Sequence, residues 1–154
     1  MISPMGGLDG LDDLYEAIIL DHYHNPRNKN FIENPDFDEE INNPFCGDEL
    51  RIQAKIIDDK IKEISVSGRG CAISQASASL LAEYAEGKKI NEIFHAVDIV
   101  RSMLKGEEIS EEDRDNIKDI DALEGVRKFP IRIKCALLGW TGFYDLINAN
   151  RGYS

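Results

Sequence analysis

The stretch LRIQAKI, residues 50–56, decides the fold. Apolar and polar residues alternate along it, which is the pattern of a β-strand with one face buried. Two aspartates at positions 58–59 supply a turn, and Ile64 and Val66 belong to a strand that returns beside the first. Ile61 fits the alternation of this second strand poorly, so the pattern leaves the pairing register open there. These residues together predict a β-hairpin.

Helical patterns surround the hairpin. Apolar residues recur at the 3 and 4 spacing of a single helix face in four segments, residues 11–25, 71–86, 93–104 and 129–147. The first helix ends before Pro26, because proline cannot continue the hydrogen-bond ladder, and the last one begins at Phe129 and Pro130. A weak strand precedes the hairpin. We therefore predict an α+β fold, a small three-stranded antiparallel sheet with about five helices packed on it.

Length and composition favour a globular protein. Of the 154 residues, 42% are hydrophobic and 31% are charged, and we expect a single domain over residues 11–154 after a flexible leader at residues 1–10. The net charge of −11 argues against a nucleic-acid partner, which would require a basic face. The longest apolar run, residues 135–138, is too short to span a membrane. Because the chain begins without the features of a signal peptide, a cytoplasmic location is expected.

Much of the negative charge lies in the acid-rich segment, residues 105–124. This segment contains nine acidic and three basic residues. A run of this kind is usually a solvated face of a folded protein. The alternative is a docking surface for a basic partner.

The three cysteines lie in unlike places. Cys46 precedes a predicted strand and is followed two residues later by Asp48, so the two side chains could offer a soft and a hard ligand to one ion. Cys71 stands at the start of a predicted helix, where the free N–H groups and the helix dipole favour a thiolate. Cys135 lies inside the last helix, on the side away from its apolar stripe, which suggests a shallow site rather than the core.

Three thiolates and a carboxylate form a ligand set that tetrahedral zinc accepts. The spacing between the cysteines, 25 and then 64 residues, is not diagnostic of a metal site, and no Cys-x-x-Cys pair exists. An odd number of cysteines also argues against a disulfide framework. From the pattern alone, unrelated buried thiols remain the more frequent situation, because free cysteine is a common core residue.

Other polar residues are weaker candidates for a functional site. His22 and His24, at the end of the first helix, are more typical of helix capping than of ligands. The pair Gly68 and Gly70 lacks the further glycine of a dinucleotide-binding turn. The serines at positions 74, 77 and 79 have no base nearby in the sequence, so close helix packing explains them better than catalysis.

Four sequence blocks, taken in order, carry a family resemblance. They are LYEAIILDHYHNPRN at 14–28, NPFCGD at 43–48, GRGCAISQAS at 68–77 and LEGVRKFPIRIKCALLGW at 123–140. Together they resemble the IscU/NifU-like iron–sulfur cluster assembly family. Lys134 stands where scaffold-type members have histidine, and the interval between Cys71 and Cys135 is longer than in those scaffolds. Both features are similar to the SufU branch. The chain also lacks the Leu-Pro-Pro-Val-Lys stretch by which scaffolds recruit their chaperone.

The resemblance implies a SufE/NifU-like fold and a specific chemistry. It implies zinc (Zn2+) held by Cys46, Asp48, Cys71 and Cys135. It also implies that Cys46 accepts persulfide sulfur from a SufS-type cysteine desulfurase, with Arg132 as an orienting residue, and passes it on to other cluster-assembly proteins. The chain would then be a sulfurtransferase that acts together with the desulfurase rather than a stand-alone enzyme.

Two alternatives stay open at this point. The same three thiolates, Cys46, Cys71 and Cys135, could hold iron or a [2Fe-2S] cluster that is assembled on the protein and then transferred. A non-catalytic alternative is a regulatory zinc protein that activates the desulfurase only by docking to it. In each case the partners are proteins, and neither nucleic acid nor membrane is expected.

Overall fold

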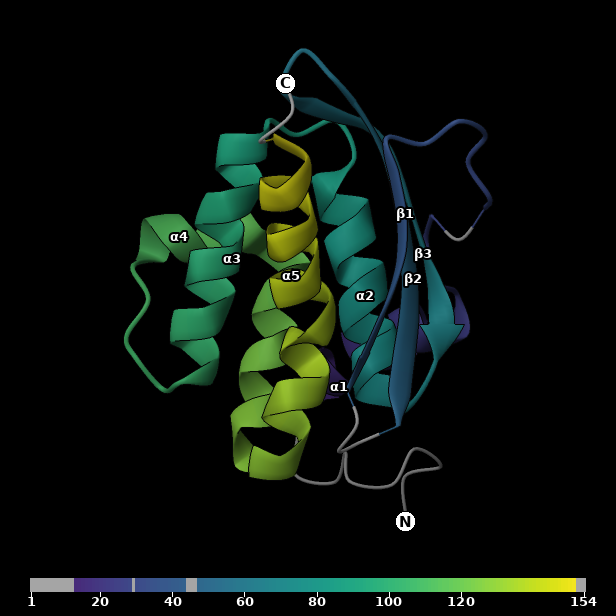
Figure 1. Cartoon of the computed structure of the whole chain (residues 1–154). Coiled ribbons are helices and arrows are strands. Elements are labelled where there is room, and N and C mark those ends of the chain that lie inside the picture. Colours follow the sequence, from purple (N-terminus) through teal and green to yellow (C-terminus); the bar gives the residue numbers. More distant parts are fainter. Residues whose placement is uncertain (1–12, 29, 44–46, 152–154) are drawn as a thin grey trace.

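A computed structural model describes residues 13–28, 30–43 and 47–151. In chain order the elements are α1 (Asp13–His24), β1 (Phe37–Asn43), β2 (Asp48–Ile57), β3 (Lys60–Arg69), α2 (Ala72–Ala85), α3 (Ile90–Leu104), α4 (Glu111–Ile117), the 3-10 helix η1 (Lys118–Lys128) and α5 (Pro130–Arg151). The strands form one antiparallel sheet in the order β1-β2-β3. Figure 1 shows α2 and α5 lying against this sheet, with α3 and α4 outside them. The α+β prediction is confirmed.

The hairpin has the predicted turn and a bulge. Asp58 and Asp59 both have positive φ angles, +52° and +61°, which are typical of the two-residue turn that joins antiparallel strands. The register shifts between Lys55 and Ile56, and Ile61 is completely buried. An extra residue in one strand re-aims the side chains that follow, so this bulge explains why Ile61 did not fit the alternation.

The acid-rich segment folds into α4 and the first part of η1, which the sequence analysis did not predict. Its apolar side chains Ile117, Ile120 and Leu123 are buried and pack in the hydrophobic core. The sequence pattern missed them because α4 is only seven residues long and three acidic residues occupy its first turn. Arg114 forms ion pairs with Asp121 and Glu124, so part of the negative charge is compensated within the segment itself.

Helix α1 buries most of its predicted apolar face, since Ile19 is buried and Tyr15 and Ile18 pack against the core. Leu14 was expected to be buried, but 64% of its surface is exposed. His22 is buried beside Ile19, because α1 packs against α2 and η1. The leader predicted for residues 1–10 lies outside the described residues.

Helix α5 is the longest element and begins at Pro130, as predicted. Its apolar stripe supplies four completely buried side chains to the core, Ala136, Trp140, Phe143 and Ile147. No helix in the described part of the chain is long and apolar enough to cross a membrane.

Candidate metal centre

Three potential metal ligands meet where three elements begin. Asp48 opens β2, Cys71 directly precedes α2, and Cys135 lies in the second turn of α5. One ligand atom from each residue lies within 4.8 Å of the other two. The beginnings of β2, α2 and α5 lie together at the lower end of the molecule in Figure 1. We refer to Asp48, Cys71 and Cys135 as the thiol cluster.

Two glycines allow the chain to pass close to Asp48. At Gly70, where φ is +153°, a Cβ atom would lie 2.1 Å from Oδ1 of Asp48. At Gly68, where φ is +156°, a Cβ atom would lie 2.0 Å from the backbone oxygen of Glu49. Only glycine avoids these collisions in this backbone conformation. The glycine pair therefore serves the approach of Cys71 to Asp48, which accords with the rejection of a dinucleotide-binding turn.

Asp48 is completely buried, and only one of its two carboxylate oxygens has a hydrogen-bond partner among the described residues. Its Oδ1 accepts a hydrogen bond from the backbone N–H of Cys71 over 2.9 Å. Its Oδ2 has no hydrogen-bond partner among the described residues. A buried carboxylate oxygen without a partner is costly, because its hydration is lost and nothing replaces it. A cation bound beside this oxygen would remove that cost, so the orphaned atom fits a metal ligand.

Cys71 occupies the N-cap of α2, in agreement with the sequence analysis. Its Sγ accepts a hydrogen bond from the backbone N–H of Ser74 over 3.4 Å. In return, the Ser74 hydroxyl donates to the backbone oxygen of Cys71 over 3.1 Å. The two hydrogen bonds join the side chain and the backbone of Cys71 to the first turn of α2. The loop and the helix therefore hold Cys71 in a single position.

Cys135 is completely buried but stands apart from the main hydrophobic core. It faces away from the apolar stripe of α5, as the helix geometry predicted. The expected shallow position is wrong, however, because Asp48 and Cys71 come together on the same side and enclose the sulfur. Within the described part of the chain, Cys71 and Cys135 are not joined in a disulfide.

Arg132 contacts both described thiols. Burial lowers the pKa of Arg132, but the charges of Cys71 and Cys135 and hydrogen bonds to both raise it, and the net shift is upward. The guanidinium therefore stays charged beside the sulfurs. The thiol cluster can carry three negative charges when ionised, and Arg132 compensates one. The remaining negative charge and the mixture of sulfur and oxygen donors suit a divalent cation such as zinc.

Cys46, the fourth predicted ligand, lies outside the described residues, as do its two predecessors. The residues on either side are described. The backbone N–H of Gly47 donates to the backbone oxygen of Asn43 over 2.9 Å, and Gly47 has a φ of +71°. The chain therefore leaves β1 and enters β2 at nearly the same point, immediately beside Asp48.

A buried polar contact joins α2 to α5 close to the thiol cluster. Trp140 donates from Nε1 to the hydroxyl of Ser77 over 2.9 Å, and this hydroxyl donates to the backbone oxygen of Ala136 over 2.6 Å. Ser77 lies six residues after Cys71, and Ala136 directly follows Cys135. The serine was correctly expected to serve helix packing. The sequence did not predict that Trp140 donates a hydrogen bond to Ser77, because its place in the apolar stripe of α5 already explained its burial.

A second set of possible ligands is the histidine cluster, which we define as His22, Glu83 and Asp119. One ligand atom from each lies within 4.8 Å of the others. His22 is buried, and its Nδ1 lies 2.8 Å from the hydroxyl of Ser79 on α2. Burial lowers the pKa of His22, and the positive charge of Arg27 lowers it further. His22 thus joins two helices rather than capping its own.

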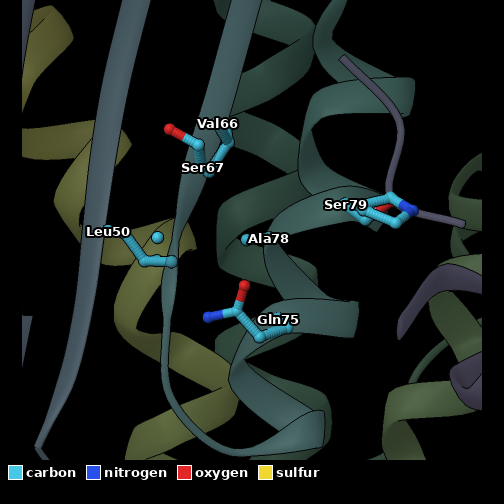
Figure 2. Close-up of a pocket in the computed structure, with 8 residues that line it drawn as sticks. Leu50, Val66, Ser67, Gln75, Ala78 and Ser79 are labelled. Carbon is cyan, nitrogen blue, oxygen red and sulfur yellow. The ribbon is translucent and has the colours of Figure 1, made fainter. Parts of the chain in front are cut away.

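Figure 2 shows the space between the sheet and α2, where Gln75 extends from the helix toward the strand that carries Leu50. The cavity there has a volume of about 110 Å³ and is also lined by Val66 and Ala78. Pockets for small organic ligands are several times larger, typically about 300–1,000 Å³. This cavity is therefore a gap in the packing and not a substrate site.

Comparison with known proteins agrees with the fold. A model of the NifU-like N-terminal domain matches residues 14–136. The zinc-dependent sulfurtransferase SufU of Bacillus subtilis is 43% identical over 130 residues, which are 84% of this chain and 86% of that protein. The iron–sulfur cluster assembly scaffold protein IscU of Streptococcus pyogenes is 34% identical over 140 residues, 91% of this chain and 86% of that protein.

A solved structure shares the architecture as well. It is described as an iron–sulfur cluster assembly scaffold protein for the SUF system of Fervidobacterium islandicum, and it superimposes with a TM-score of 0.76 and 32% identity. The match covers 83% of this chain and 92% of that one. The extent of these matches confirms the resemblance that the four sequence blocks indicated. The chain therefore belongs to the NifU-like N-terminal domain family, among the iron–sulfur cluster assembly proteins of the IscU and SufU type.

Proposed function

We propose that this protein is a zinc-bound sulfur acceptor in the cytoplasm, which takes persulfide sulfur from a SufS-type cysteine desulfurase and relays it to iron–sulfur cluster assembly. One observation carries the proposal. Two thiols and a carboxylate converge within 4.8 Å, and one buried oxygen of that carboxylate, Oδ2 of Asp48, lacks a partner among the described residues. The name of the Bacillus subtilis relative, a zinc-dependent sulfurtransferase, supports the same chemistry.

The residues that would hold zinc are Cys46, Asp48, Cys71 and Cys135. Zinc keeps thiols ionised at neutral pH without redox chemistry of its own. Cys46 precedes Asp48 by two residues in the sequence, and the proposal assigns it the fourth ligand position. These four residues complete the number of ligands that tetrahedral zinc requires.

We assign the role of sulfur acceptor to Cys46. Cys135 is completely buried, and Cys71 is fixed as the cap of α2, so neither can move far to meet a donor. Cys46 belongs to the connection between two strands. Its thiolate attacks the outer sulfur of the donor's persulfide, a new S–S bond forms at Cys46, and the donor cysteine leaves as a thiolate. The sulfur moves with no net oxidation or reduction, so the step needs no further reagent.

Arg132 has an orienting role in this proposal. It contacts the thiols of Cys71 and Cys135 and stays charged beside them. The guanidinium holds the two sulfurs in place while Cys46 accepts its new sulfur. The chain therefore acts as a sulfurtransferase together with the desulfurase and not as an enzyme on its own.

A second candidate function is that of a scaffold for a [2Fe-2S] cluster. Thiolates of the same three cysteines are suitable ligands for iron. The 34% identity with the scaffold protein IscU of Streptococcus pyogenes favours this alternative. Under this alternative the iron and sulfide are cargo that the protein assembles and passes on.

Purification without oxygen distinguishes the two functions. One zinc per chain and no visible absorption are expected for the sulfur acceptor. A brown chromophore with stoichiometric iron would instead establish the scaffold. The measurements are metal analysis and ultraviolet–visible spectroscopy on the same sample.

Mass spectrometry then locates the accepted sulfur. After incubation with the desulfurase and cysteine, a mass increase of about 32 Da, one sulfur atom, is expected on Cys46. The Cys46→Ser variant should show no such adduct, even where it retains some zinc. An adduct that maps to Cys135 and survives in Cys46→Ser would overturn the assignment of the acceptor.

A further inference from the structure

The side chain of Gln75 pairs with the backbone that leads into the thiol cluster. Gln75 lies on α2, one helical turn after Cys71. In the amide orientation that gives both of its polar atoms a partner, Nε2 donates to the backbone oxygen of Gly68, and Oε1 accepts from the backbone N–H of Gly70, each over 3.3 Å. The side chain therefore crosses from the helix to the residues just before Cys71.

These contacts take the place of a neighbouring strand. Within the described part of the chain, β3 lies at one edge of the sheet, so no strand pairs with its outer side. The backbone oxygen of Asn28 accepts from the N–H of Val66 on that side over 2.8 Å. Two residues later, Gly68 presents its backbone groups to the same side. A glutamine amide contains a donor and an acceptor, as a peptide group does, so Gln75 can satisfy them.

Hydrogen bonds, more than dense packing, fix the position of Gln75. The side chain lines the cavity of about 110 Å³ between the sheet and α2 (Figure 2). A side chain that borders a cavity makes fewer close contacts than one in the core, so its polar contacts contribute more to its position. The cavity also allows a side chain of similar size to replace Gln75 without overpacking.

The backbone that Gln75 holds continues directly to Asp48. The N–H of Cys71, the residue after Gly70, donates to Oδ1 of Asp48 over 2.9 Å. A shift of the backbone at Gly70 would therefore move the N–H that orients the carboxylate. That orientation determines where Oδ2 points, and Oδ2 is the buried oxygen that has no hydrogen-bond partner among the described residues.

We propose that Gln75 is a positioning residue of the metal centre, which holds the backbone at Gly68 and Gly70 so that the contact between Cys71 and Asp48 has the geometry that a bound ion requires. The inference rests on the proposed function, because it takes the thiol cluster as the zinc site. Gln75 acts through the backbone and is not itself a ligand. Loss of a residue that orients metal ligands typically weakens metal binding by about 10–100-fold.

The other glutamine of the chain, Gln53 on β2, offers a matched control. Its Oε1 accepts from the backbone N–H of Ile32 over 3.1 Å, and its Nε2 lies 3.5 Å from the backbone oxygen of the same residue. Nε2 also donates to the carboxylate of Asp38 over 3.1 Å. Gln53 follows Asp48 by five residues, about 17 Å along the strand. Its loss therefore removes at least as many hydrogen bonds at a place remote from the thiol cluster.

Substitution of each glutamine by methionine tests the proposal. Methionine is similar to glutamine in length and helix propensity but cannot form these hydrogen bonds. Gln75→Met should release zinc about tenfold faster than the wild type, measured by stopped flow with a coloured chelator. Gln53→Met should release zinc at the wild-type rate, although its melting temperature should fall because a buried polar network is lost.

Hydrogen exchange in the zinc-free protein gives a readout that does not depend on the metal. The backbone N–H groups of Gly70 and Cys71 should exchange about tenfold faster in Gln75→Met than in the wild type, because this backbone opens more easily. Gln75→Glu keeps an acceptor for the N–H of Gly70 but has no donor for Gly68 when ionised. Protection of the Gly70 N–H should therefore be retained in Gln75→Glu. NMR measures the exchange residue by residue.

Two outcomes would overturn the positioning role. In one, Gln75→Met releases zinc at the wild-type rate, even where its backbone exchanges faster. In the other, Gln53→Met accelerates zinc release as much as Gln75→Met does, which would make the effect one of overall stability. A wild-type protein that binds no zinc would reject the proposed function instead. In that case the exchange of the Cys71 N–H decides separately, because an unchanged rate in Gln75→Met would reject the positioning role as well.

Discussion

The thiol cluster and the histidine cluster both bring three possible metal ligands within 4.8 Å of one another. They differ in whether the ligand atoms already have hydrogen-bond or ion-pair partners in the surrounding protein. In the thiol cluster, Oδ2 of Asp48 is buried and has no hydrogen-bond partner among the described residues. In the histidine cluster, His22 contacts Ser79, and Glu83 pairs with Arg27 over 3.1 Å. Proximity of possible ligands is therefore insufficient, and a buried carboxylate oxygen without a hydrogen-bond partner is the more informative sign of a metal site.

The two clusters also differ in their charge and exposure. Arg132 compensates only part of the negative charge that the thiol cluster can carry. Near the histidine cluster, Arg27 forms ion pairs with both Asp21 and Glu83, and a cation bound there would have to compete with it. Glu83 and Asp119 are exposed, so water already satisfies much of their charge. We expect zinc at the thiol cluster and none at the histidine cluster.

Removal of the metal should have the largest effect on stability. The unfolded chain holds no such site, so binding to the folded state contributes directly to the free energy of unfolding. Strong chelation should lower the melting temperature by about 5 °C or more, measured by calorimetry. A variant that carries Cys71→Ala and Cys135→Ala is the control and should not respond to the chelator. An unchanged melting curve after verified removal of the metal would contradict a shared site.

A matched pair of substitutions tests the comparison directly. Asp48→Ala should lower the zinc content and slow sulfur transfer, because it opens one ligand position while three thiols remain. His22→Ala should leave one zinc per chain, although it should reduce the free energy of unfolding by about 2 kcal/mol through the loss of buried contacts. Metal analysis and chemical denaturation measure both effects. A loss of zinc in His22→Ala with full retention in Asp48→Ala would reverse the assignment of the two clusters.

The contact between Ser77 and Trp140 should have a smaller effect. Ser77→Ala leaves the indole N–H of Trp140 buried without its acceptor, which should cost about 1–3 kcal/mol of stability. Because the contact lies beside Cys71 and Cys135, zinc affinity should fall as well. Competition with a coloured chelator measures that affinity, and Ser67→Ala on the exposed face of β3 is the control. If both variants bind zinc equally well, the contact serves the core alone.

The smallest expected effect is the pH dependence caused by His22. Its pKa lies below the ordinary value of 6.5 in the folded protein, because burial and then Arg27 disfavour the charged imidazole. The unfolded state therefore takes up a proton more readily as the pH falls, and stability decreases below about pH 6.5. Above that pH both states are neutral at this residue, and its contribution is complete. Denaturation of the wild type and of His22→Gln across this range should give a shallower slope for the variant.

Local patterns in the sequence predicted the hairpin, its Asp58–Asp59 turn and the start of α5 at Pro130. These features depend on neighbouring residues, since alternation and backbone preference act over a few positions. The bulge before Ile61 and the exposure of Leu14 could not be predicted in this way. Both depend on which distant surface each element packs against, and the amphipathic pattern of one element does not contain that information.

The candidate site was likewise predictable from the sequence only in part. The sequence by itself determined the types of ligand, the position of Cys71 at a helix N-terminus and the family to which the chain belongs. Only the tertiary structure decided that Asp48, Cys71 and Cys135 meet, because 23 residues separate the first two and 64 the last two. The orphaned oxygen of Asp48 is likewise a property of the packed interior. Whether a buried polar atom has a partner depends on the several elements that surround it, and these come together only on folding.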